Sequence, residues 1–508
     1  MSHFTTPVDK AIISNMNSQS IDVDITRSIL DRYNRGEFAD QSAVEVTEIP
    51  EIDGRQVLDM RDNYTLSISR ERLQSRLSDL GLDPQLPYSK GRDTTQGAGD
   101  TVELSKEQLE EIGRRLFPVT ALGVLNGGSA TSYADRKKNT KLNKELLDLL
   151  DEPFSRLSEE ASGRPKGLTP AYINPDGSLG AGFLELRMRN LALSGVPMFQ
   201  MTSGMTDGPL REAYKEYASG AVVGSAIKES GFPVTEVKGA VQPLIAAYTH
   251  SDEEVNGRKA IFTHAHGREG ETLPLPGGHG QNFAVLKEVY KSLLGDGKRF
   301  VYLGNVDNLG FTPDAGTLAY FALSDRGAAF EFIFRTPVDV KGGILVRDKN
   351  GHLNCGDIGP AIDAESVFAA EESGKKILFN CATGLFDLKR LVSDIDRIIR
   401  DLPTRFSDQD KDAGRYSQAE QVTWEVLGIL DDFLIFGVDK YRRFLSAKML
   451  LETLMTSGIM LDSPDYPTSD DPAQDTRGAA RRLHKGFEEL MRREYRMELD
   501  RGRWVPKA

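Results

Sequence analysis

The chain has 508 residues, of which 39% are hydrophobic and 27% are charged, and its net charge is −13 at pH 7. Its apolar runs are far shorter than the roughly 20 residues that cross a membrane, and a negative field opposes non-specific binding to nucleic acid. We therefore expect a globular protein with no transmembrane segment and no nucleic-acid partner.

The first thirty residues contain no basic leader followed by an apolar core, so we expect no secretory signal and a cytoplasmic location. The two cysteines, Cys355 and Cys381, do not form a CxxC pair. This spacing argues against both a disulfide framework and a zinc site.

The pattern of apolar and polar residues changes twice along the chain. Residues 1–115 form a polar N-terminal extension that ends in the linker-like stretch "GRDTTQGAGD". Between residues 116 and 400 short apolar runs alternate with helical patterns. The runs that read as strands are "PVTALGVL", "VPMFQM", "KAIFTH", "RFVYLGNV", "AFEFIF" and "KKILFN", and those that read as helices include "GPLREAYKEYASG" and "QNFAVLKEVYKSLLG". This alternation predicts a three-layer α/β domain that binds ligands beyond the C-terminal ends of its strands.

Residues 401–508 are predicted to form an α-helical C-terminal region. In "QVTWEVLGILDDFLIFGVDKYRRFLSAKMLLETLM" the apolar residues recur at spacings of three and four, which indicates at least two helices interrupted at Gly437. The basic tail that follows should be an amphipathic helix, because Leu483, Phe487, Leu490 and Met491 fall on one helical face.

Three glycine-rich stretches follow predicted strands or turns. In "VLNGGSATSY" the two glycines would let a phosphate chain approach main-chain N–H groups. In "GRPKG" Lys166 offers one mobile positive charge, and in "LPLPGGHGQN" three glycines surround His279. Each stretch also has a plain structural alternative: a strand-to-helix turn, an exposed loop lysine and a structural histidine.

A fourth stretch, "FVYLGNVDNLG", delivers Asp307 to the C-terminal edge of a strand. Mg²⁺ takes one or two carboxylates together with substrate phosphate oxygens, so Asp307 suits a magnesium ligand. The alternative is an Asx turn in which this carboxylate only caps the next helix.

Together, the ordered segments "LNGGSAT", "GRPKG", "PGGHG", "NVDNLG", "VKGG" and "LFNCATGLF" resemble the UTP:sugar-1-phosphate uridylyltransferase family, the UDP-sugar pyrophosphorylases, and most closely its UDP-glucose branch. The resemblance spans roughly residues 116–391. It implies a Rossmann-like mixed-sheet nucleotidyltransferase core, with Mg²⁺ as cofactor and with UTP and a sugar 1-phosphate as partners.

The resemblance also implies roles for individual residues. It assigns the nucleotide and its phosphates to Leu125, Asn126, Gly127, Gly128, Ser129, Ala130 and Thr131. It places Lys166 against the phosphates, Gly278 beside the uracil, and Asp307 on Mg²⁺. It assigns the sugar phosphate to His279, Asn305, Asn308, Gly343, Asp357, Lys376 and Asn380.

The chain departs from the family pattern at several positions. Asp357 stands where the family has Glu, Lys376 is shifted by one position, Ala130 replaces a glycine, and His264 stands in the segment that offers a glutamine to uracil. A long insert, whose "NKELLDLLDEPFSRL" part has helical periodicity, separates the glycine-rich loop from Lys166. We expect this insert to return the lysine to the site.

The expected reaction makes UDP-glucose and pyrophosphate from UTP and glucose 1-phosphate. The alternatives are a UDP-N-acetylglucosamine pyrophosphorylase and a non-catalytic sugar-nucleotide-binding homologue. An NAD-linked dehydrogenase is disfavoured, because the loop reads GGSAT and lacks the GxGxxG pattern.

Overall fold

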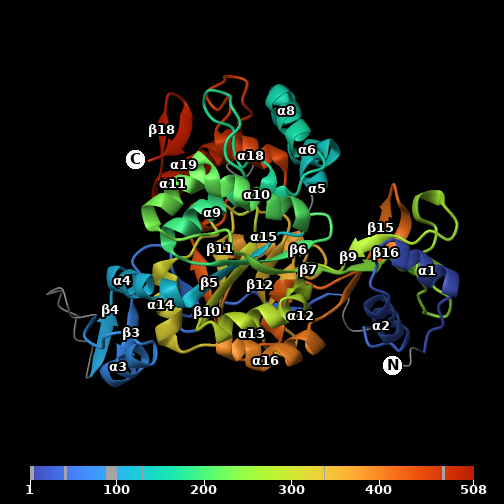
Figure 1. Cartoon of the computed structure of the whole chain (residues 1–508), viewed down its shortest axis with the longest axis horizontal. Coiled ribbons are helices and arrows are strands. Elements are labelled where there is room, and N and C mark those ends of the chain that lie inside the picture. Colours follow the sequence, from blue (N-terminus) through green and yellow to red (C-terminus); the bar gives the residue numbers. More distant parts are fainter. Residues whose placement is uncertain are drawn as a thin grey trace.

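A mixed sheet of eleven strands forms the centre of the computed structural model, which describes residues 5–38, 43–86, 100–128, 130–336, 338–471 and 475–507 (Figure 1). The main path of the sheet runs, in spatial order, through β2 (Val57–Asp59), β17 (Phe433–Val438), β11 (Ala328–Phe334), β14 (Leu378–Asp387), β10 (Phe300–Asn305), β5 (Thr120–Leu125), β6 (Met198–Ser203) and β7 (Lys238–Gln242). The remaining strands, β1 (Val46–Glu48), β12 (Gly343–Asp348) and β13 (Leu353–Asp357), extend it beside the start of β14.

One edge of this sheet collects the ends of most strands. The strands β10, β5, β6 and β7 pair in parallel, as do β11, β17 and β2, and β14 runs antiparallel between β10 and β11. Every residue of β5 and β6 is buried, as expected for parallel strands that are covered on both faces. The segments after β5, β6, β7 and β10 therefore meet at a common edge.

Helices cover both faces of the sheet. One face packs against the helices α4 (Lys106–Leu116), α9 (Phe183–Ser194), α10 (Asp207–Ser219), α11 (Ala221–Ser230) and α14 (Ala315–Ser324). The other face packs against α12 (Asn282–Val285), α13 (Lys287–Gly295) and α16 (Leu388–Asp401), which lie below the sheet in Figure 1. A further helix, α15 (Ala364–Glu372), links β13 to β14.

The insert between the glycine-rich loop and Lys166 is helical, as predicted. It consists of α5 (Thr131–Ala134), α6 (Arg136–Leu142), α7 (Lys144–Leu149) and α8 (Asp151–Ala161). It projects at the top of Figure 1 and returns the chain to the sheet edge at the 3-10 turn η3 (Lys166–Leu168).

A side lobe with its own small cores stands at the right of Figure 1. It is built from α1 (Lys10–Ser18), α2 (Val23–Asn34), β8 (Leu244–Ala246), β9 (Pro274–Pro276), β15 (Arg405–Lys411) and β16 (Gly414–Glu420). On the opposite side, β3 (Leu66–Ser69), β4 (Thr101–Leu104) and α3 (Arg70–Asp79) form a smaller unit beside α14.

The C-terminal region is partly helical. The tail forms α19 (Thr476–Arg493), which buries Leu483, Phe487, Leu490 and Met491 as predicted, and α17 (Lys440–Arg443) and α18 (Leu450–Ser457) precede it. The helical prediction is wrong for residues 405–438, which form β15, β16, the 3-10 turn η7 (Thr423–Gly428) and the central strand β17. The hairpin β18 (Met497–Asp500) and β19 (Arg503–Pro506) ends the described chain.

The predicted α/β core is confirmed. Five of the six predicted strands appear as β5, β6, β10, β11 and β14. The strand prediction for "KAIFTH" is wrong, since residues 259–264 make only isolated bridges in the side lobe.

The domain boundaries at residues 115 and 400 stay predictions. The central sheet includes strands from both sides of each boundary. The predicted linker lies almost wholly outside the described residues. Within those residues, each helix is too short or too polar to cross a bilayer.

Candidate functional site

Lys166 and Asp307 meet at the sheet edge, although 141 positions separate them in the sequence. The Nζ atom of Lys166 lies 2.8 Å from Oδ2 of Asp307, and the two side chains are 11% and 14% exposed. Asp307 follows β10, and the backbone N–H of Lys166 donates to the Gly128 carbonyl after the neighbouring strand β5. The predicted convergence of one ammonium and one carboxylate is therefore present.

The backbone of Ala447 holds both members of this pair. Its carbonyl accepts a hydrogen bond from the Lys166 ammonium, and its N–H donates to the Asp307 carbonyl over 3.2 Å. The second carboxylate oxygen of Asp307, Oδ1, is buried and has no hydrogen-bond partner among the described residues. A buried carboxylate oxygen without a donor fits a cation ligand.

The glycine-rich loop is open where a ligand could approach. A Cβ added to Gly128 would meet nothing within 4 Å, whereas one added to Gly127 would lie 3.4 Å from Oε1 of Gln242. Neither glycine has a positive φ, so close approach, and not left-handed backbone, is their use here. Ala130 has φ −77°, so the alanine at this position costs no strain.

Other members of the predicted nucleotide loop are placed as follows. Leu125 pairs with Asn305 across β5 and β10. Asn126 is fully buried, and its backbone bonds to Met201 and Thr206 fix the loop to β6 and the turn after it. Ser129 lies outside the described residues, and Thr131 opens α5.

Gln242 joins the loop to Gly278 and was not predicted from the sequence. Its Nε2 atom donates to the Gly278 carbonyl at 2.7 Å and to Oε1 of Gln281 at 2.9 Å. Gly278 has φ +82°, and a Cβ there would lie 2.7 Å from the Gln421 backbone nitrogen. One wall of the candidate site is therefore formed by Gln242 at the end of β7, Gly278, and Gln421, which follows β16 of the side lobe. The single sequence carries no local signal for Gln242, because its place at the end of β7 beside β6 appears only in the fold.

His279 is held as a neutral imidazole. Its Nδ1 atom accepts a hydrogen bond from the Thr423 backbone N–H at 3.1 Å and lies 2.8 Å from the Thr423 hydroxyl. Because Nδ1 is an acceptor, the ring proton resides on Nε2. Burial, and then the nearby charge of Lys448, lowers the pKa of His279 to about 4. At neutral pH this residue can donate a hydrogen bond but carries no positive charge.

Gly343, Asp357 and Asn380, which the resemblance assigns to the sugar phosphate, lie next to one another. Gly343 is the strand partner of Asp357, and a Cβ on it would lie 3.3 Å from Oδ1 of Asp357 and 3.8 Å from Cβ of Asn380. A bulge in β14 displaces Cys381 and Ala382 from the register with β11, and Ala382 takes φ +54°. Its N–H donates to Oδ1 of Asn380 at 2.9 Å, which fixes the orientation of this amide.

Lys448, which no sequence motif marks, lies near these groups. Burial is the largest influence on three nearby pKa values: it lowers that of His279 and raises those of Asp357 and Glu452. The positive charge of Lys448 acts to lower all three. Lys448 is exposed, and no hydrogen bond or ion pair to its ammonium is found in the described part of the chain. Lys448 directly follows Ala447, whose backbone bonds to Lys166 and Asp307. This segment therefore also carries a second lysine whose ammonium has no hydrogen-bond or ion-pair partner among the described residues.

Four predicted residues are placed less favourably. Lys376 is exposed just before β14, and the structure shows no contact that joins it to Lys166 or Asp307. His264 is exposed in the side lobe, where it bridges to Glu271. Asn305 is half-buried at the end of β10. Asn308 is 2% exposed, and its amide bonds Arg443 and Gly310 within the protein, so this arrangement does not present it to a ligand.

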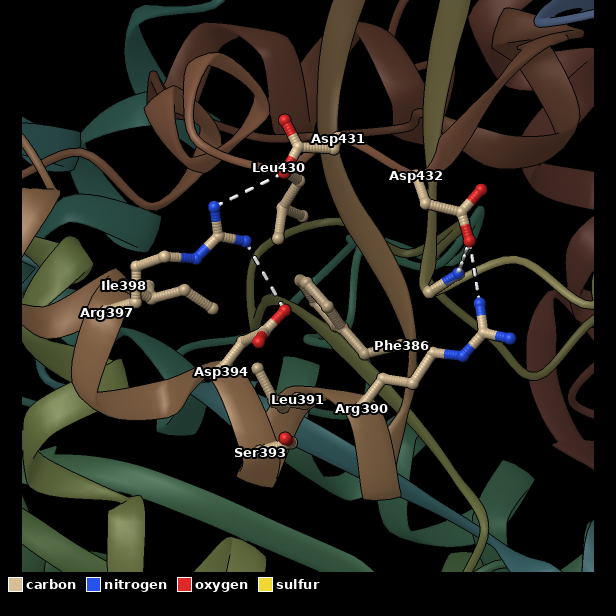
Figure 2. Close-up of a pocket in the computed structure, with 11 residues that line it drawn as sticks. Phe386, Arg390, Leu391, Ser393, Asp394, Arg397, Ile398, Leu430, Asp431 and Asp432 are labelled. Carbon is tan, nitrogen blue, oxygen red and sulfur yellow. Dashed lines mark hydrogen bonds and ion pairs between the residues drawn. The ribbon is translucent and has the colours of Figure 1, made fainter.

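A separate pocket of about 260 Å³ lies at the opposite edge of the sheet (Figure 2). Gly327 and Asp432 in its wall precede β11 and β17, so they mark the N-terminal ends of strands. Its arginines are paired: Arg390 with Asp432 at 2.7 Å, and Arg397 with Asp394 and Asp431 at 3.4 Å. This pocket is distinct from the site around Asp307.

Known proteins share both the sequence pattern and the fold. A family model described as UTP--glucose-1-phosphate uridylyltransferase matches residues 187–459, over half of the chain. A uridylyltransferase of this name from Solanum tuberosum is 28% identical over 220 residues, which are 42% of this chain and 44% of the relative. One from Encephalitozoon cuniculi is 37% identical over 87 residues, 17% of each chain. The chain thus matches less than half the length of these curated relatives.

Solved structures extend the likeness in fold. A UDP-glucose phosphorylase from Trypanosoma brucei superposes with a TM-score of 0.54 at 17% identity, covering 91% of this chain and 80% of that one. The UDP-glucose pyrophosphorylase from Leishmania major gives a TM-score of 0.50 at 15% identity over 86% of this chain and 76% of that one. The solved structures show the shared fold, and the family model, which matches over half of the chain, shows that the chain belongs to the UTP--glucose-1-phosphate uridylyltransferase family.

Proposed function

We propose that the protein transfers the uridylyl group of UTP to glucose 1-phosphate and so forms UDP-glucose and pyrophosphate. The observation that carries this proposal is the meeting of Lys166 and Asp307 at 2.8 Å, beside an open glycine-rich loop. Family membership supports the same reaction, as do the printed names of the matched relatives.

The reaction is an in-line displacement at phosphorus. A phosphate oxygen of the sugar 1-phosphate forms a bond to the α-phosphorus of UTP, and the bond from that phosphorus to the bridging oxygen of pyrophosphate breaks. The attacking oxygen is already ionised, so the site needs no general base. It must instead align two anions and stabilise the added negative charge.

The two lysines divide this work. Lys166, beside the loop that would wrap the triphosphate, stabilises charge on the transferred and leaving phosphates. The charge of Lys448 acts on His279 and Asp357 of the predicted sugar pocket, which suits this lysine to the attacking sugar phosphate. The neutral His279 can add a hydrogen bond from Nε2–H.

Asp307 would hold Mg²⁺, through the carboxylate oxygen that lacks a donor. No group of three or more metal-ligating side chains is found in the described ranges, as expected for a cation that completes its shell with phosphate oxygens and water. When bound, Mg²⁺ supplies positive charge to the triphosphate. Asp307→Asn should therefore abolish most of the Mg²⁺ dependence of activity, and unchanged activation in a Mg²⁺ titration would remove Asp307 from the metal shell.

Sugar and base selectivity follow from the pocket walls. Asp357 and Asn380 offer an acceptor and an amide to sugar hydroxyls, and Gln242 with Gly278 offers an amide wall to the base. We propose glucose as the sugar, with N-acetylglucosamine as the second candidate because Asp357 is shorter than the family's Glu. A cytoplasmic location also stays a prediction.

The test is a panel of UTP, ATP, GTP and CTP against glucose, galactose and N-acetylglucosamine 1-phosphates, followed by pyrophosphate detection. We expect the fastest release from UTP with glucose 1-phosphate. Binding of UDP-glucose without pyrophosphate release from any pair would show a non-catalytic homologue instead.

A further inference from the structure

We propose that Tyr133 is a positioning residue that keeps the Lys166 ammonium in place while Asp307 is engaged by a cation. This inference rests on the proposed function. Tyr133 lies in α5, within the insert that separates the glycine-rich loop from Lys166, and is 2% exposed. The Lys166 Nζ atom stands 4.7 Å from the centroid of its ring.

The three partners of Lys166 differ in what they do to its charge. Asp307 is an anion, so its ion pair with Lys166 neutralises both groups. The Ala447 carbonyl and the Tyr133 ring are neutral, and they attract the ammonium without cancelling its charge. A cation bound at Oδ1 of Asp307 would offset the charge of this carboxylate and weaken its attraction for the Lys166 ammonium at Oδ2. The carbonyl and the ring would then carry more of the hold on the lysine, together with the Coulombic attraction of Glu452.

This division matters because a lysine whose ion pair is weakened is held less firmly at the end of its flexible stem. Left with one carbonyl, the ammonium would sample several positions around the triphosphate. The ring face restricts it from a second direction and leaves its positive charge for the phosphates. Tyr133 thus holds the Lys166 ammonium in one position and leaves its positive charge free to act on the phosphates.

The ring is itself held from several sides. Its hydroxyl lies 2.7 Å from the hydroxyl of Thr453, which is 1% exposed in α18. The Tyr133 carbonyl accepts from Nδ2 of Asn139 at 3.1 Å, and Oδ1 of Asn139 accepts from the Leu451 N–H at 2.9 Å. The insert is therefore fastened to the first turns of α18, the helix that follows Lys448.

The phenol stays neutral under working conditions. Burial raises its pKa well above the ordinary range, and the charges of Glu452 and Asp307 act in the same direction. The ring therefore remains an uncharged face at neutral pH.

Three variants separate the ring from its hydroxyl. Tyr133→Phe keeps the ring, Tyr133→Leu removes it, and Thr453→Val removes the partner of the hydroxyl. We expect Tyr133→Leu to lower kcat about tenfold, within the roughly 2- to 30-fold range that spans exposed to desolvated cation–π contacts. The Kd for UTP, measured by calorimetry without sugar phosphate, should rise by a smaller factor. Tyr133→Phe and Thr453→Val should stay within about twofold of wild type in both, although each lowers the Tm.

Equal losses in Tyr133→Phe and Tyr133→Leu would overturn the inference, because the hydroxyl would then be responsible. Unchanged kcat and Kd in Tyr133→Leu would overturn it as well. If Tyr133→Leu does not fold, a series of fluorinated phenylalanines at position 133 replaces it. Each added fluorine weakens the ring face at nearly constant shape, so kcat should fall stepwise, and a flat series would refute the contact.

The wild type separates this result from that of the proposed function. If it releases no pyrophosphate in the panel, the proposed reaction fails. The Kd for UTP across the same variants still reports whether the ring positions Lys166, since a double-mutant cycle with Lys166→Met should then show no further effect of Tyr133→Leu.

Discussion

Lys166 has its closest contacts with a carboxylate, a carbonyl oxygen and an aromatic face, and together they bury nearly the whole side chain. A lysine buried in this way would be costly if it served only the fold, since the desolvation of both charges offsets much of their attraction. Its place beside the open backbone of Gly128 gives it a target in the triphosphate.

Replacing this lysine should affect turnover more than folding. Lys166→Ala should lower kcat at least about a hundredfold, as for other groups that stabilise developing charge. Lys166→Met, which keeps the buried stem, is the matched variant that isolates the charge. Both should retain a cooperative thermal transition. Near-normal pyrophosphate release by a folded variant would contradict the assignment.

His279 should make folding sensitive to acid. Its pKa is lowered from 6.5 to about 4 in the folded protein, so between these values the unfolded chain binds more protons. The free energy of unfolding therefore falls as the pH drops through this window. His279→Asn keeps an acceptor for the Thr423 N–H but does not titrate. In urea unfolding between pH 7 and pH 5, wild type should lose between about 1 and 2 kcal/mol more than this variant. Equal losses would show that His279 does not titrate as described.

The residue scale also shows how much of the site could be predicted. Lys166 and Asp307 carried a local signal, a charged residue beside glycines, whereas Gly343, Asp357 and Asn380 were expected only from the family resemblance. Lys448 and Gln242 carried neither signal. Lys448 lies within a stretch whose apolar spacing favoured helix, and Gln242 gains its role only from neighbouring strands that a single sequence does not place together.

At the scale of elements, the turns after the strands differ in what their glycines do. Gly128 faces open space with an ordinary backbone, whereas Gly278 has φ +82° and abuts the Gln421 backbone. Gly128 therefore leaves room for a ligand, whereas Gly278 lets the core pack against the backbone that leaves the side lobe.

A pair of alanine variants should separate these two uses. Gly128→Ala should leave the free energy of unfolding within about 1 kcal/mol of wild type but raise the Kd for UTP, because the methyl group enters the space proposed for phosphate. Gly278→Ala should lower stability by at least about 2 kcal/mol, from left-handed strain and the clash. Urea unfolding and calorimetry measure both. Tight UTP binding by Gly128→Ala would place the phosphates elsewhere.

The element that sequence reasoning misassigned most clearly is β17. Its six residues are all buried, so the strand shows no alternation, and a short apolar run fits helix and buried strand equally well. Gly437 was read as a break between helices. In the structure a Cβ there would lie 3.0 Å from the Phe334 ring and 3.1 Å from the Leu58 carbonyl, so this glycine admits close packing within the sheet. The alternating region from β5 to β14 was predictable because turns and helices separate its strands.

For the whole molecule, the sheet has two edges with different properties. The Asp307 edge gathers open backbone, an unpaired carboxylate oxygen and an unengaged lysine. The opposite edge, drawn in Figure 2, gathers arginines that are already paired with aspartates.

Substitutions at the opposite edge should therefore leave catalysis unchanged. Asp394→Asn and Arg397→Gln, each in an ion pair at 3.4 Å, should keep kcat and the KM for UTP within about twofold of wild type. Steady-state pyrophosphate release provides the measurement. A large change in either constant would reveal coupling across the sheet that the separation of the two edges does not predict.

The order of strands has a consequence for synthesis. Val57 of β2 pairs with Ile435 of β17, so the partner of this early strand lies roughly 380 positions later in the chain. At about 5–20 residues per second, the N-terminal strand waits roughly 20–75 s on the ribosome before its neighbour exists. The strand β11 ends at residue 334, and its partner β17 begins only at residue 433, so one side of β11 also stays unpaired for about the last 100 positions of this interval. Messages truncated before codon 433 should therefore yield aggregates and not a smaller folded enzyme.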